Sequence, residues 1–143
     1  MVEEGGQVVT NGLARRIAAA HWLGFYYLGP DLAGIAALKR PPAPYRGRVF
    51  RHAGISDLVL PSRVELGWVY TKGSYRGSGI AFRLCESLLE KVRGSDVFAT
   101  VRQDNDAMRN LLTSLGFRPV GRPYVGPESG KLVELWISNP GVV

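Results

Sequence analysis

The chain has 143 residues, of which 45% are hydrophobic and 21% charged, values typical of a soluble globular protein forming one domain over residues 1–143. The acidic N-terminal stretch is unlike a signal peptide, and no apolar run is long enough to span a membrane. The single cysteine, Cys85, excludes an internal disulfide and a multi-cysteine zinc site. We therefore expect a cytoplasmic protein with no membrane contact and no bound metal.

Much of the net charge of +6 is concentrated in one segment. Residues 39–52 contain five basic residues and no acidic one: Lys39, Arg40, Arg46, Arg48 and Arg51. The segment is open to three interpretations: a solvated loop, a site that attracts an anionic small molecule, or a nucleic-acid surface that also uses Tyr45 and Phe50. We favour the solvated loop, and nucleic acid is the least expected partner.

Turn and capping residues predict the elements of the first half. Apolar residues at helical spacing predict a short helix capped by Thr10 or Asn11. Two apolar segments within residues 22–39 flank a Gly-Pro-Asp turn, which predicts a β-hairpin. The prolines of residues 40–44 argue against regular structure there, and residues 49–61 show no assignable pattern.

The second half alternates between strand and helix patterns. The predicted elements are a strand at 64–71, a helix at 79–92, a strand at 97–103, a helix at 105–115, and two strands at 117–124 and 131–138 that pair across a glycine turn. Asn105 is expected to cap the second of these helices, and Gly116 to end it in the left-handed conformation.

Residues 72–79, Lys-Gly-Ser-Tyr-Arg-Gly-Ser-Gly, join the first of these strands to its helix. They form neither a Walker loop, because no lysine follows Gly77 or Gly79, nor a dinucleotide fingerprint, because the third glycine is missing. Small residues at such a junction let backbone N–H groups converge on one anion beside the positive end of the helix. The alternative is a tight turn that uses glycine only for its positive φ.

Two motifs in this half resemble those of the GNAT N-acetyltransferase superfamily. The first, Arg76-Gly77-Ser78-Gly79-Ile80-Ala81, fits Arg/Gln-x-x-Gly-x-Gly/Ala, the family's acetyl-CoA pyrophosphate loop. The second, Asn105, Met108, Leu111, Leu112 and Gly116-Phe117, is similar to the family's Asn…Leu-Tyr…Gly-Phe helix. The resemblance is specific from about Val64 to Phe117. It implies the α/β (α+β) GNAT fold: a central mixed, mostly antiparallel sheet, splayed around the acetyl-CoA arm and flanked by helices.

The resemblance also implies the cofactor and its contacts. The cofactor is acetyl-CoA, used as the acyl donor. Its pyrophosphate is expected on the loop, whose contributing residues are Arg76, Gly77, Ser78, Gly79, Ile80 and Ala81. Val69 and Thr71 are expected to bond the pantetheine arm as a neighbouring strand would. Asn105 is expected to touch the same arm, and its role as an N-cap is an alternative that could coexist with this contact.

The implied reaction transfers the acetyl group to a primary amine, of a small molecule or a protein, by direct attack in a ternary complex. A lysine-like amine with a pKa of about 10.4 is almost fully protonated at pH 7, so a base is needed. Glu65 is the expected base, because strand alternation places it on the face shared by Val69 and Thr71. The alternative is a surface carboxylate on a half-exposed strand. Glu134 and Asp57 are poorer candidates.

The chain departs from the family pattern at Leu112, where relatives commonly carry a tyrosine that protonates the departing thiolate. A thiol of pKa about 8.5 forgoes only about 2 kcal/mol at pH 7 without an acid. Tyr70, Tyr75 and Tyr124 are alternative donors, and the sequence does not choose among them. Leu112 therefore motivates an alternative of another class, an acyl-CoA-binding module with little or no turnover. A homodimer is also left open.

Three other kinds of residue are assigned structural roles. Cys85 is in helical register with Leu88, which predicts a core thiol rather than an acyl carrier. Trp68 is expected in the core. Neither His21 nor His52 has a partner at metal-ligand spacing.

Overall fold

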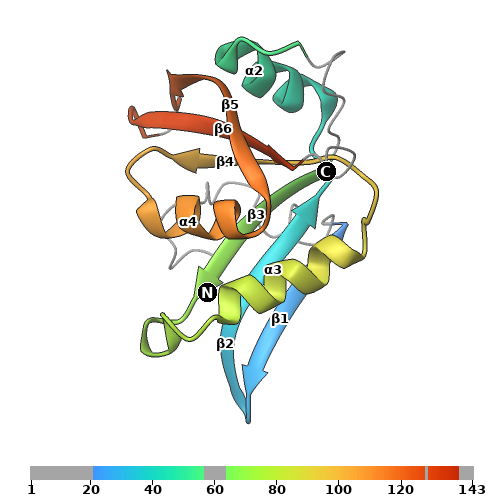
Figure 1. The fold of residues 1–143 in the computed structure, drawn as a ribbon, viewed down its shortest axis with the longest axis vertical. Helices are drawn as coiled ribbons and strands as arrows, with labels where there is room; N and C mark the ends of the chain where they lie inside the picture. Colours follow the sequence, from blue (N-terminus) through green and yellow to red (C-terminus); the bar gives the residue numbers. More distant parts are fainter. Residues whose placement is uncertain (1–20, 57–63, 128, 139–143) are drawn as a thin grey trace. The chain divides into compact units, whose positions relative to one another are not determined.

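The computed structural model describes residues 21–56, 64–127 and 129–138 (Figure 1). The strands are β1 (Trp22–Leu28), β2 (Asp31–Lys39), β3 (Val64–Thr71), β4 (Val97–Arg102), β5 (Phe117–Val125) and β6 (Leu132–Ser138). The helices are α2 (Ala43–Ala53), α3 (Ile80–Glu90), α4 (Asp106–Ser114) and the short 3-10 helix η2 (Gly73–Tyr75). Within the described ranges the strands form one six-stranded mixed sheet of order β1-β2-β3-β4-β6-β5. The predicted mixed sheet with flanking helices is confirmed.

The chain divides into two compact units, and β3 belongs to both. The first unit comprises Met1–Lys39 and Leu66–Arg93, and the second comprises Arg40–Glu65 and Gly94–Val143. The first two residues of β3 therefore lie in the second unit and the rest of the strand in the first. The expectation of a single domain over residues 1–143 stays a prediction.

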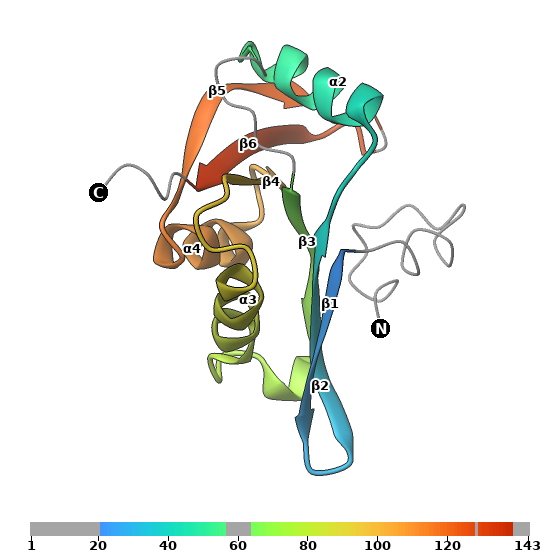
Figure 2. The same ribbon diagram turned by 90° about the vertical axis from the view of Figure 1, so that its right-hand side faces the viewer.

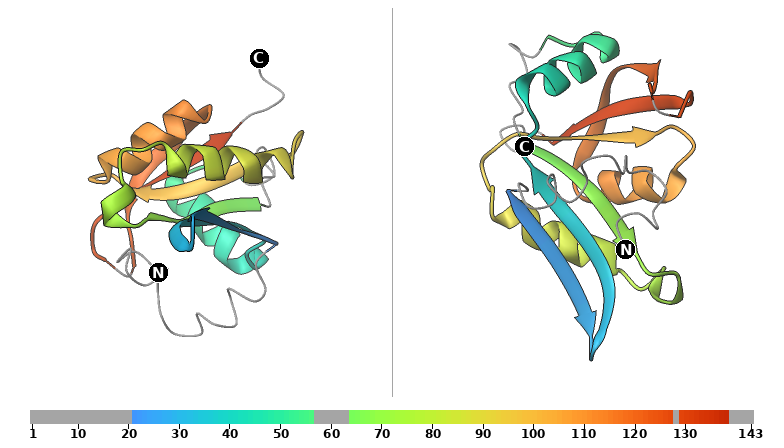
Figure 3. Two further views of the ribbon diagram at one scale, coloured as in Figure 1. Left: turned by 90° about the horizontal axis from the view of Figure 1, so that it is seen from below. Right: turned by 180° about the vertical axis from the view of Figure 1, so that it is seen from behind.

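The first unit is built on the predicted β-hairpin, which is confirmed. β1 pairs antiparallel with β2, from Trp22 opposite Leu38 to the turn, and α3 lies along this hairpin (Figure 3, right). Two glycines allow the close approach of the helix. A Cβ on Gly24 would lie 2.9 Å from a methyl carbon of Leu84, and one on Gly34 would lie 3.0 Å from the γ-methyl carbon of Ile80. The helix that contacts them carries Cys85, which is fully buried, so the prediction of a core thiol is also confirmed.

The second unit contains a hydrophobic core beneath α2, which lies over β5 and β6 (Figure 2). The core residues are Val49, Phe50, Ala53, Phe98, Leu135 and Ile137. The rings of Phe50 and Phe98 meet edge to face with centroids 5.4 Å apart, a geometry that adds about 0.5–1.5 kcal/mol to their burial. β5 and β6 pair antiparallel, which confirms the predicted C-terminal strand pair.

The segment from residue 40 corrects the sequence analysis. Irregular structure was expected at residues 40–44, but α2 begins at Ala43, with Pro42 as its N-cap and Pro44 in its first turn. A helix needs no backbone N–H in its first turn, so the prolines start the helix rather than prevent it. The helix ends at Gly54, whose φ of 77° is left-handed. The basic residues of this helix therefore do not form the solvated loop that we favoured.

β3 departs from regular alternation at Trp68. Its φ of 51° lies in the left-handed region, which residues other than glycine rarely adopt. Trp68 is half-buried, with Lys39 Nζ 4.8 Å from its ring centroid, so it is not the core residue that was expected. A left-handed residue changes the side to which the following side chains point. Strict alternation is interrupted at Trp68, so it no longer shows that Glu65 shares a face of β3 with Val69 and Thr71.

Two of the sequence-based predictions concern residues that the structure does not describe. These are the helix capped by Thr10 or Asn11, and Asp57. His21 is exposed, and its ring lies 5.9 Å from that of Trp22. Among the described helices, none combines the length and the apolar character needed to cross a membrane.

Candidate functional site

The glycine loop of the first unit has the backbone geometry of an anion site. Gly77 and Gly79 both have a φ of 82°, and Gly79 is the N-cap of α3. A Cβ added to either glycine would meet no atom within 4 Å. The backbone conformation therefore calls for glycine at both positions, and the space above them is open to a ligand.

Arg76 is fixed against the end of β3. Its Nε donates to the carbonyl oxygen of Thr71 at 3.1 Å, and its guanidinium carbon lies 5.4 Å from the ring centroid of Tyr70. A guanidinium held at one nitrogen keeps its other N–H groups for an external acceptor. The side chain is exposed. It therefore adds positive charge to the loop in a defined orientation.

The other loop side chains bond to the protein itself. The Ser78 hydroxyl donates to the carbonyl oxygen of Tyr75, and the Tyr75 hydroxyl donates to Asp31 Oδ2 at 2.8 Å. This hydrogen bond to a carboxylate raises the pKa of Tyr75. Both contacts hold the turn in shape, because they tie it to itself and to the hairpin.

Glu65, the expected base, is a buried residue of the second unit. Only 3% of its surface is exposed, and its Oε2 accepts a hydrogen bond from the Tyr45 hydroxyl at 2.9 Å. A carboxylate removed from water needs such donors to remain ionised. The alternative of a surface carboxylate on a half-exposed strand is therefore wrong.

Phenols from two other elements lie near this carboxylate. Tyr45 comes from α2 and Tyr124 from β5. Burial, followed by the charge of Glu65, raises the pKa of Tyr45 far above its ordinary range. Burial and the same charge raise the pKa of Tyr124 to about 12. Both phenols are therefore protonated at neutral pH, and Tyr45 is the donor in its bond to Glu65.

An irregularity in β5 positions Tyr124. The register with β6 shifts between Val120 and Tyr124, which pair with Leu135 and Val133. Within this shift Gly121 has a φ of 68°, and a Cβ there would collide with the carbonyl group of Ala53 at the end of α2. The β5 backbone thus packs directly on α2. Tyr124 then follows, packed against the core.

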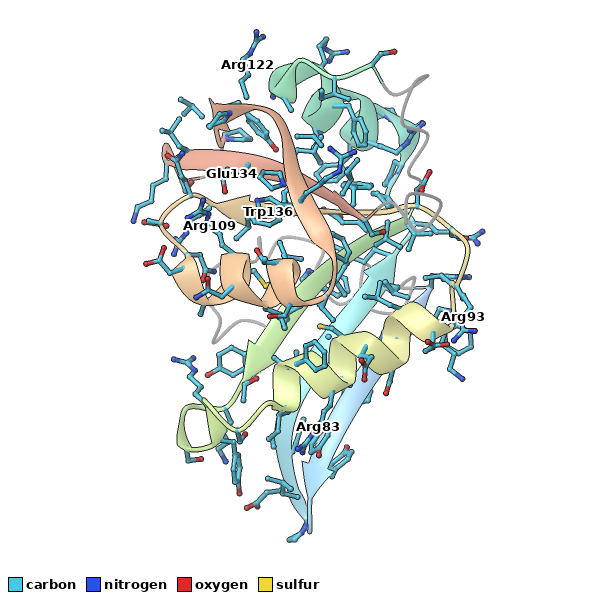
Figure 4. All side chains as sticks on the ribbon, in the orientation of Figure 1. Arg83, Arg93, Arg109, Arg122, Glu134 and Trp136 are labelled. Carbon is cyan, nitrogen blue, oxygen red and sulfur yellow. The ribbon has the colours of Figure 1, made fainter. Side chains whose placement is uncertain are left out.

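The side chains of two further candidate residues are hydrogen-bonded within the protein. Asn105 Oδ1 accepts the backbone N–H of Met108 at 3.1 Å, which confirms the predicted cap of α4. Glu134 is 8% exposed, and its Oε1 accepts from Arg109 Nε at 2.9 Å and from Trp136 Nε1 at 3.1 Å (Figure 4). Its neighbours therefore account for the buried charge of Glu134 without a role in catalysis.

The expected site residues thus fall into two sets. The first unit holds Val69, Thr71 and the loop at residues 76–81, and the second holds Glu65 and Asn105. Sequence reasoning missed Tyr45 as the partner of Glu65. A helical spacing of apolar residues could have placed Tyr45 on a helix, since Val49, Phe50 and Ala53 recur as on one helix face.

Across the described ranges, no three His, Cys, Asp or Glu side chains are grouped so that they could hold a metal ion.

Comparison with known proteins identifies the family. The model of the acetyltransferase (GNAT) family matches residues 9–117. N-alpha-acetyltransferase RimI of Mycobacterium tuberculosis is 40% identical over 77 residues, which are 52% of this chain and 49% of the relative. The matched segment thus spans about half the length of that relative.

Solved structures share the fold at low sequence identity. A GNAT-family acetyltransferase of Streptococcus agalactiae superposes with a TM-score of 0.67 at 20% identity, covering 94% of this chain and 74% of the other. The yncA protein of Salmonella typhimurium, solved with its cofactor acetyl-CoA, gives a TM-score of 0.65 at 22% identity, covering 93% and 75%. From the family match and the shared fold together, this chain belongs to the GNAT acetyltransferase family.

Proposed function

We propose that this protein transfers an acetyl group from acetyl-CoA to a primary amine in a ternary complex. The observation that carries the proposal is the open backbone at Gly77 and Gly79, at the start of α3, in a chain of this family. Two relatives support it. One is named as an N-alpha-acetyltransferase, and the other was solved with acetyl-CoA.

In this proposal the first unit binds the acyl donor. The backbone N–H groups of residues 77–81 bind the pyrophosphate, helped by the positive end of α3 and by Arg76. Val69 and Thr71 bond the pantetheine arm through their backbone. The parallel pairing of β3 with β4 comprises two residue pairs, the second of which contains Glu65. Val69 and Thr71, the residues proposed for the arm, come later in β3 than these two pairs and are not paired with β4. Asn105 is proposed as a further contact to the arm, beside its role as a cap.

Glu65 is proposed as the base. A lysine-like amine is neutral only about once in 2,500 molecules at pH 7, which costs about 4–5 kcal/mol. The amine nitrogen attacks the thioester carbonyl carbon, the C–N bond forms, and the C–S bond breaks. The amine proton passes to Glu65, and because this carboxylate is almost fully buried it passes through a water molecule. The backbone N–H of Val69 or of its neighbour is the proposed donor to the tetrahedral oxyanion.

The departing thiolate lacks a well-suited acid in the second unit. Leu112 is fully buried in α4. Tyr124, with its pKa raised to about 12, is a poorer acid than an ordinary phenol. We propose that the thiolate leaves with its charge and takes a proton from water, which forgoes about 2 kcal/mol at pH 7. The same observation favours the second candidate function, an acyl-CoA-binding module with little or no turnover.

The acceptor is proposed to be a primary amine of a small molecule or a protein, and a peptide α-amine is the first to test, given the relative named above. An α-amine of pKa about 7.7–8.0 is neutral in roughly one molecule in ten at pH 7, so its deprotonation costs only about 1 kcal/mol. The need for a base therefore differs between the two amines by about 3 kcal/mol. Dependence on Glu65 then reports which kind of amine the site serves.

Two measurements test the function. Calorimetric titration with CoA is expected to show binding, and a free-thiol assay is expected to show acetyl transfer to an amine. The assay compares peptides with a free α-amine, peptides with only a lysine amine, and small polyamines. Binding without thiol release from any of them would favour the binding module. No CoA binding by the folded protein would exclude both candidates.

A further inference from the structure

We propose that the outer side of α2 and the adjoining part of β5 bind an acidic polypeptide segment of the chain that carries the acceptor amine. The surface, which we name the basic face, consists of Arg48 and Arg51 of α2 and Arg122 of β5, all three exposed. That the bound chain is the acceptor rests on the proposed function, whereas the binding of an acidic segment does not.

The basic face is one surface of the second unit. Arg48 and Arg51 are three positions apart in α2, so their Cβ atoms lie about 5–6 Å apart on the helix surface. Arg122 lies beside the end of this helix, because a Cβ on Gly54 would be 3.6 Å from its guanidinium carbon (Figure 4). Neither α2 nor β5 contains an acidic residue. The two elements therefore present guanidinium groups without a carboxylate of their own.

No described residue neutralises the basic face. None of its three arginines makes an ion pair or a hydrogen bond within the described part of the chain. By contrast, Arg93, Arg102 and Arg109 each have a carboxylate partner, at 2.8, 3.4 and 2.9 Å. The basic face thus differs from arginines elsewhere in the molecule in having its charge available to an external anion.

The stability of α2 does not account for this charge. Like charges three positions apart on a helix repel one another and destabilise it slightly. The negative end of the helix dipole favours a cation, and His52 in the last turn is available for that role beside Arg51. An arrangement that opposes folding slightly and lacks an internal partner is typical of a surface that attracts a partner of opposite charge.

An extended acidic polypeptide fits the spacing of the basic face. Side chains at alternate positions of an extended chain point the same way and lie about 6.6 Å apart, close to the Cβ spacing of Arg48 and Arg51. A guanidinium group binds a carboxylate through two parallel N–H donors. Carboxylates at alternate positions can therefore bind successive arginines, and Arg122 extends the surface beyond the end of the helix.

The structure favours a polypeptide over nucleic acid. The nucleic-acid interpretation of residues 39–52 relied on Tyr45 and Phe50 as aromatic partners. Phe50 is 1% exposed in the core, and Tyr45 is half-buried with its hydroxyl bonded to Glu65. Neither ring is an exposed platform on which a base could stack.

The basic face lies on the two elements that bring phenols to Glu65. Tyr45 is three residues before Arg48 in α2. Tyr124 is two residues after Arg122 in β5. An acceptor chain bound at the basic face is therefore held on the unit that contains the proposed base, which raises the local concentration of its amine.

The test is fluorescence anisotropy of the full chain with two labelled peptides whose α-amines are blocked. One peptide alternates glutamate with serine, and the other alternates glutamine with serine. The parent is expected to bind the glutamate peptide more tightly, with an affinity that falls as salt is added. The double variant Arg48→Gln, Arg51→Gln should weaken this binding about three- to tenfold, as expected for the loss of two exposed ion pairs.

The matched control is the double variant Lys91→Gln, Arg93→Gln. It removes the same charge from two exposed residues that follow α3 in the first unit. It should leave the affinity for the glutamate peptide unchanged. The melting temperature of the Arg48→Gln, Arg51→Gln variant should be equal to that of the parent or slightly higher, because a repulsion within α2 is removed.

Three results would overturn the proposal. One is equal affinity of the parent for the two peptides, and another is equal weakening by the two double variants. The third is a single-stranded oligonucleotide that binds more tightly than the glutamate peptide at the same salt concentration, which would favour nucleic acid. If the Arg48→Gln, Arg51→Gln variant does not fold, Arg122→Gln decides, and an unchanged affinity for the glutamate peptide in that variant would overturn the proposal equally.

A transfer assay separates this inference from the proposed function. Two peptides with the same free N-terminal residue, followed by alternating glutamate or by alternating glutamine, are compared as acceptors. The parent should prefer the glutamate peptide through a lower KM, and Arg48→Gln, Arg51→Gln should lose most of this preference. A parent that binds the blocked glutamate peptide but acetylates no amine would contradict the proposed function alone. An active parent without the preference would contradict this inference.

Discussion

The glycine loop of the first unit and the Glu65 cluster of the second are built in opposite ways. The loop is a single run of residues, exposed, and its proposed binding groups are backbone N–H groups made accessible by Gly77 and Gly79. The cluster, Glu65 with Tyr45 and Tyr124, has a buried carboxylate between two half-buried phenols and joins side chains from α2, β3 and β5. A site made of consecutive backbone depends on local conformation, whereas a site made of converging side chains depends on the whole unit. The two should respond differently to substitution.

The largest effect is expected at Glu65. Glu65→Gln should lower the rate with a lysine amine by about 10²–10⁴-fold at neutral pH, because general base catalysis is lost, while CoA affinity is kept. Activity should recover in part as pH rises and neutral amine accumulates. Glu134→Gln is the matched control, since it also neutralises a buried carboxylate of the second unit. A Glu65→Gln profile that matches the parent from pH 6 to 9 would place the base elsewhere.

A substitution in the glycine loop should change the affinity for acetyl-CoA rather than the rate of acetyl transfer. Gly79→Val should raise the dissociation constant of acetyl-CoA at least tenfold, because its φ of 82° disfavours any side chain and the added atoms would occupy the open approach to the backbone. Gly73→Val is the control within the same stretch, since Gly73 also faces open space but does not have a positive φ. Calorimetry measures both. Equal affinity in folded Gly79→Val would remove the cofactor assignment.

A third substitution tests whether the second unit can be given the family's usual acid. Leu112→Tyr would speed the chemical step by at most about thirtyfold if the position faces the departing sulfur. Leu112 is fully buried, however, so a larger side chain should cost about 1–3 kcal/mol of unfolding free energy. Thermal denaturation measures this cost, and Thr113→Tyr, at an exposed position of the same helix, should be nearly neutral. An unchanged melting temperature would show that the core accommodates the ring.

The smallest effect is expected at the exposed tyrosine–carboxylate pair of the first unit. Asp31→Asn should lower the pKa of Tyr75 towards its ordinary value of 10.0, because the carboxylate that holds the phenol proton is removed. Alkaline difference spectra against the parent measure this shift. The melting temperature should barely change, since the bond is exposed to solvent. A large loss of stability would mean that the Tyr75–Asp31 hydrogen bond stabilises the fold as much as a buried hydrogen bond does, despite its exposure.

The same contrast explains what could be predicted from the sequence. The hairpin, the strands from residue 64 onwards and the cap at Asn105 were predictable, because turn residues, alternation and caps act within a few positions. The glycine loop belongs to this class. Its spacing supplied the first of the two motifs on which the family resemblance rests.

The cluster could not be predicted in the same way. Tyr45 and Glu65 are 20 positions apart, and the prolines that start α2 suggested an irregular segment. Nothing in the local sequence indicates the left-handed φ of Trp68, because residues other than glycine rarely adopt that conformation. The choice of Glu65 was reached through alternation along β3. Its burial and its partner required the fold.

The two phenols near Glu65 also give the second unit a built-in optical reporter. In the folded protein the raised pKa values of Tyr45 and Tyr124 keep both rings un-ionised at a pH where an ordinary tyrosine, with a pKa of about 10, is mostly tyrosinate. Their contribution to stability is complete below that ordinary pKa and declines as pH rises towards the folded-state values. Between the two, opening of this unit releases protons and switches on tyrosinate absorption. Its unfolding can then be followed by ultraviolet light without a dye or a label.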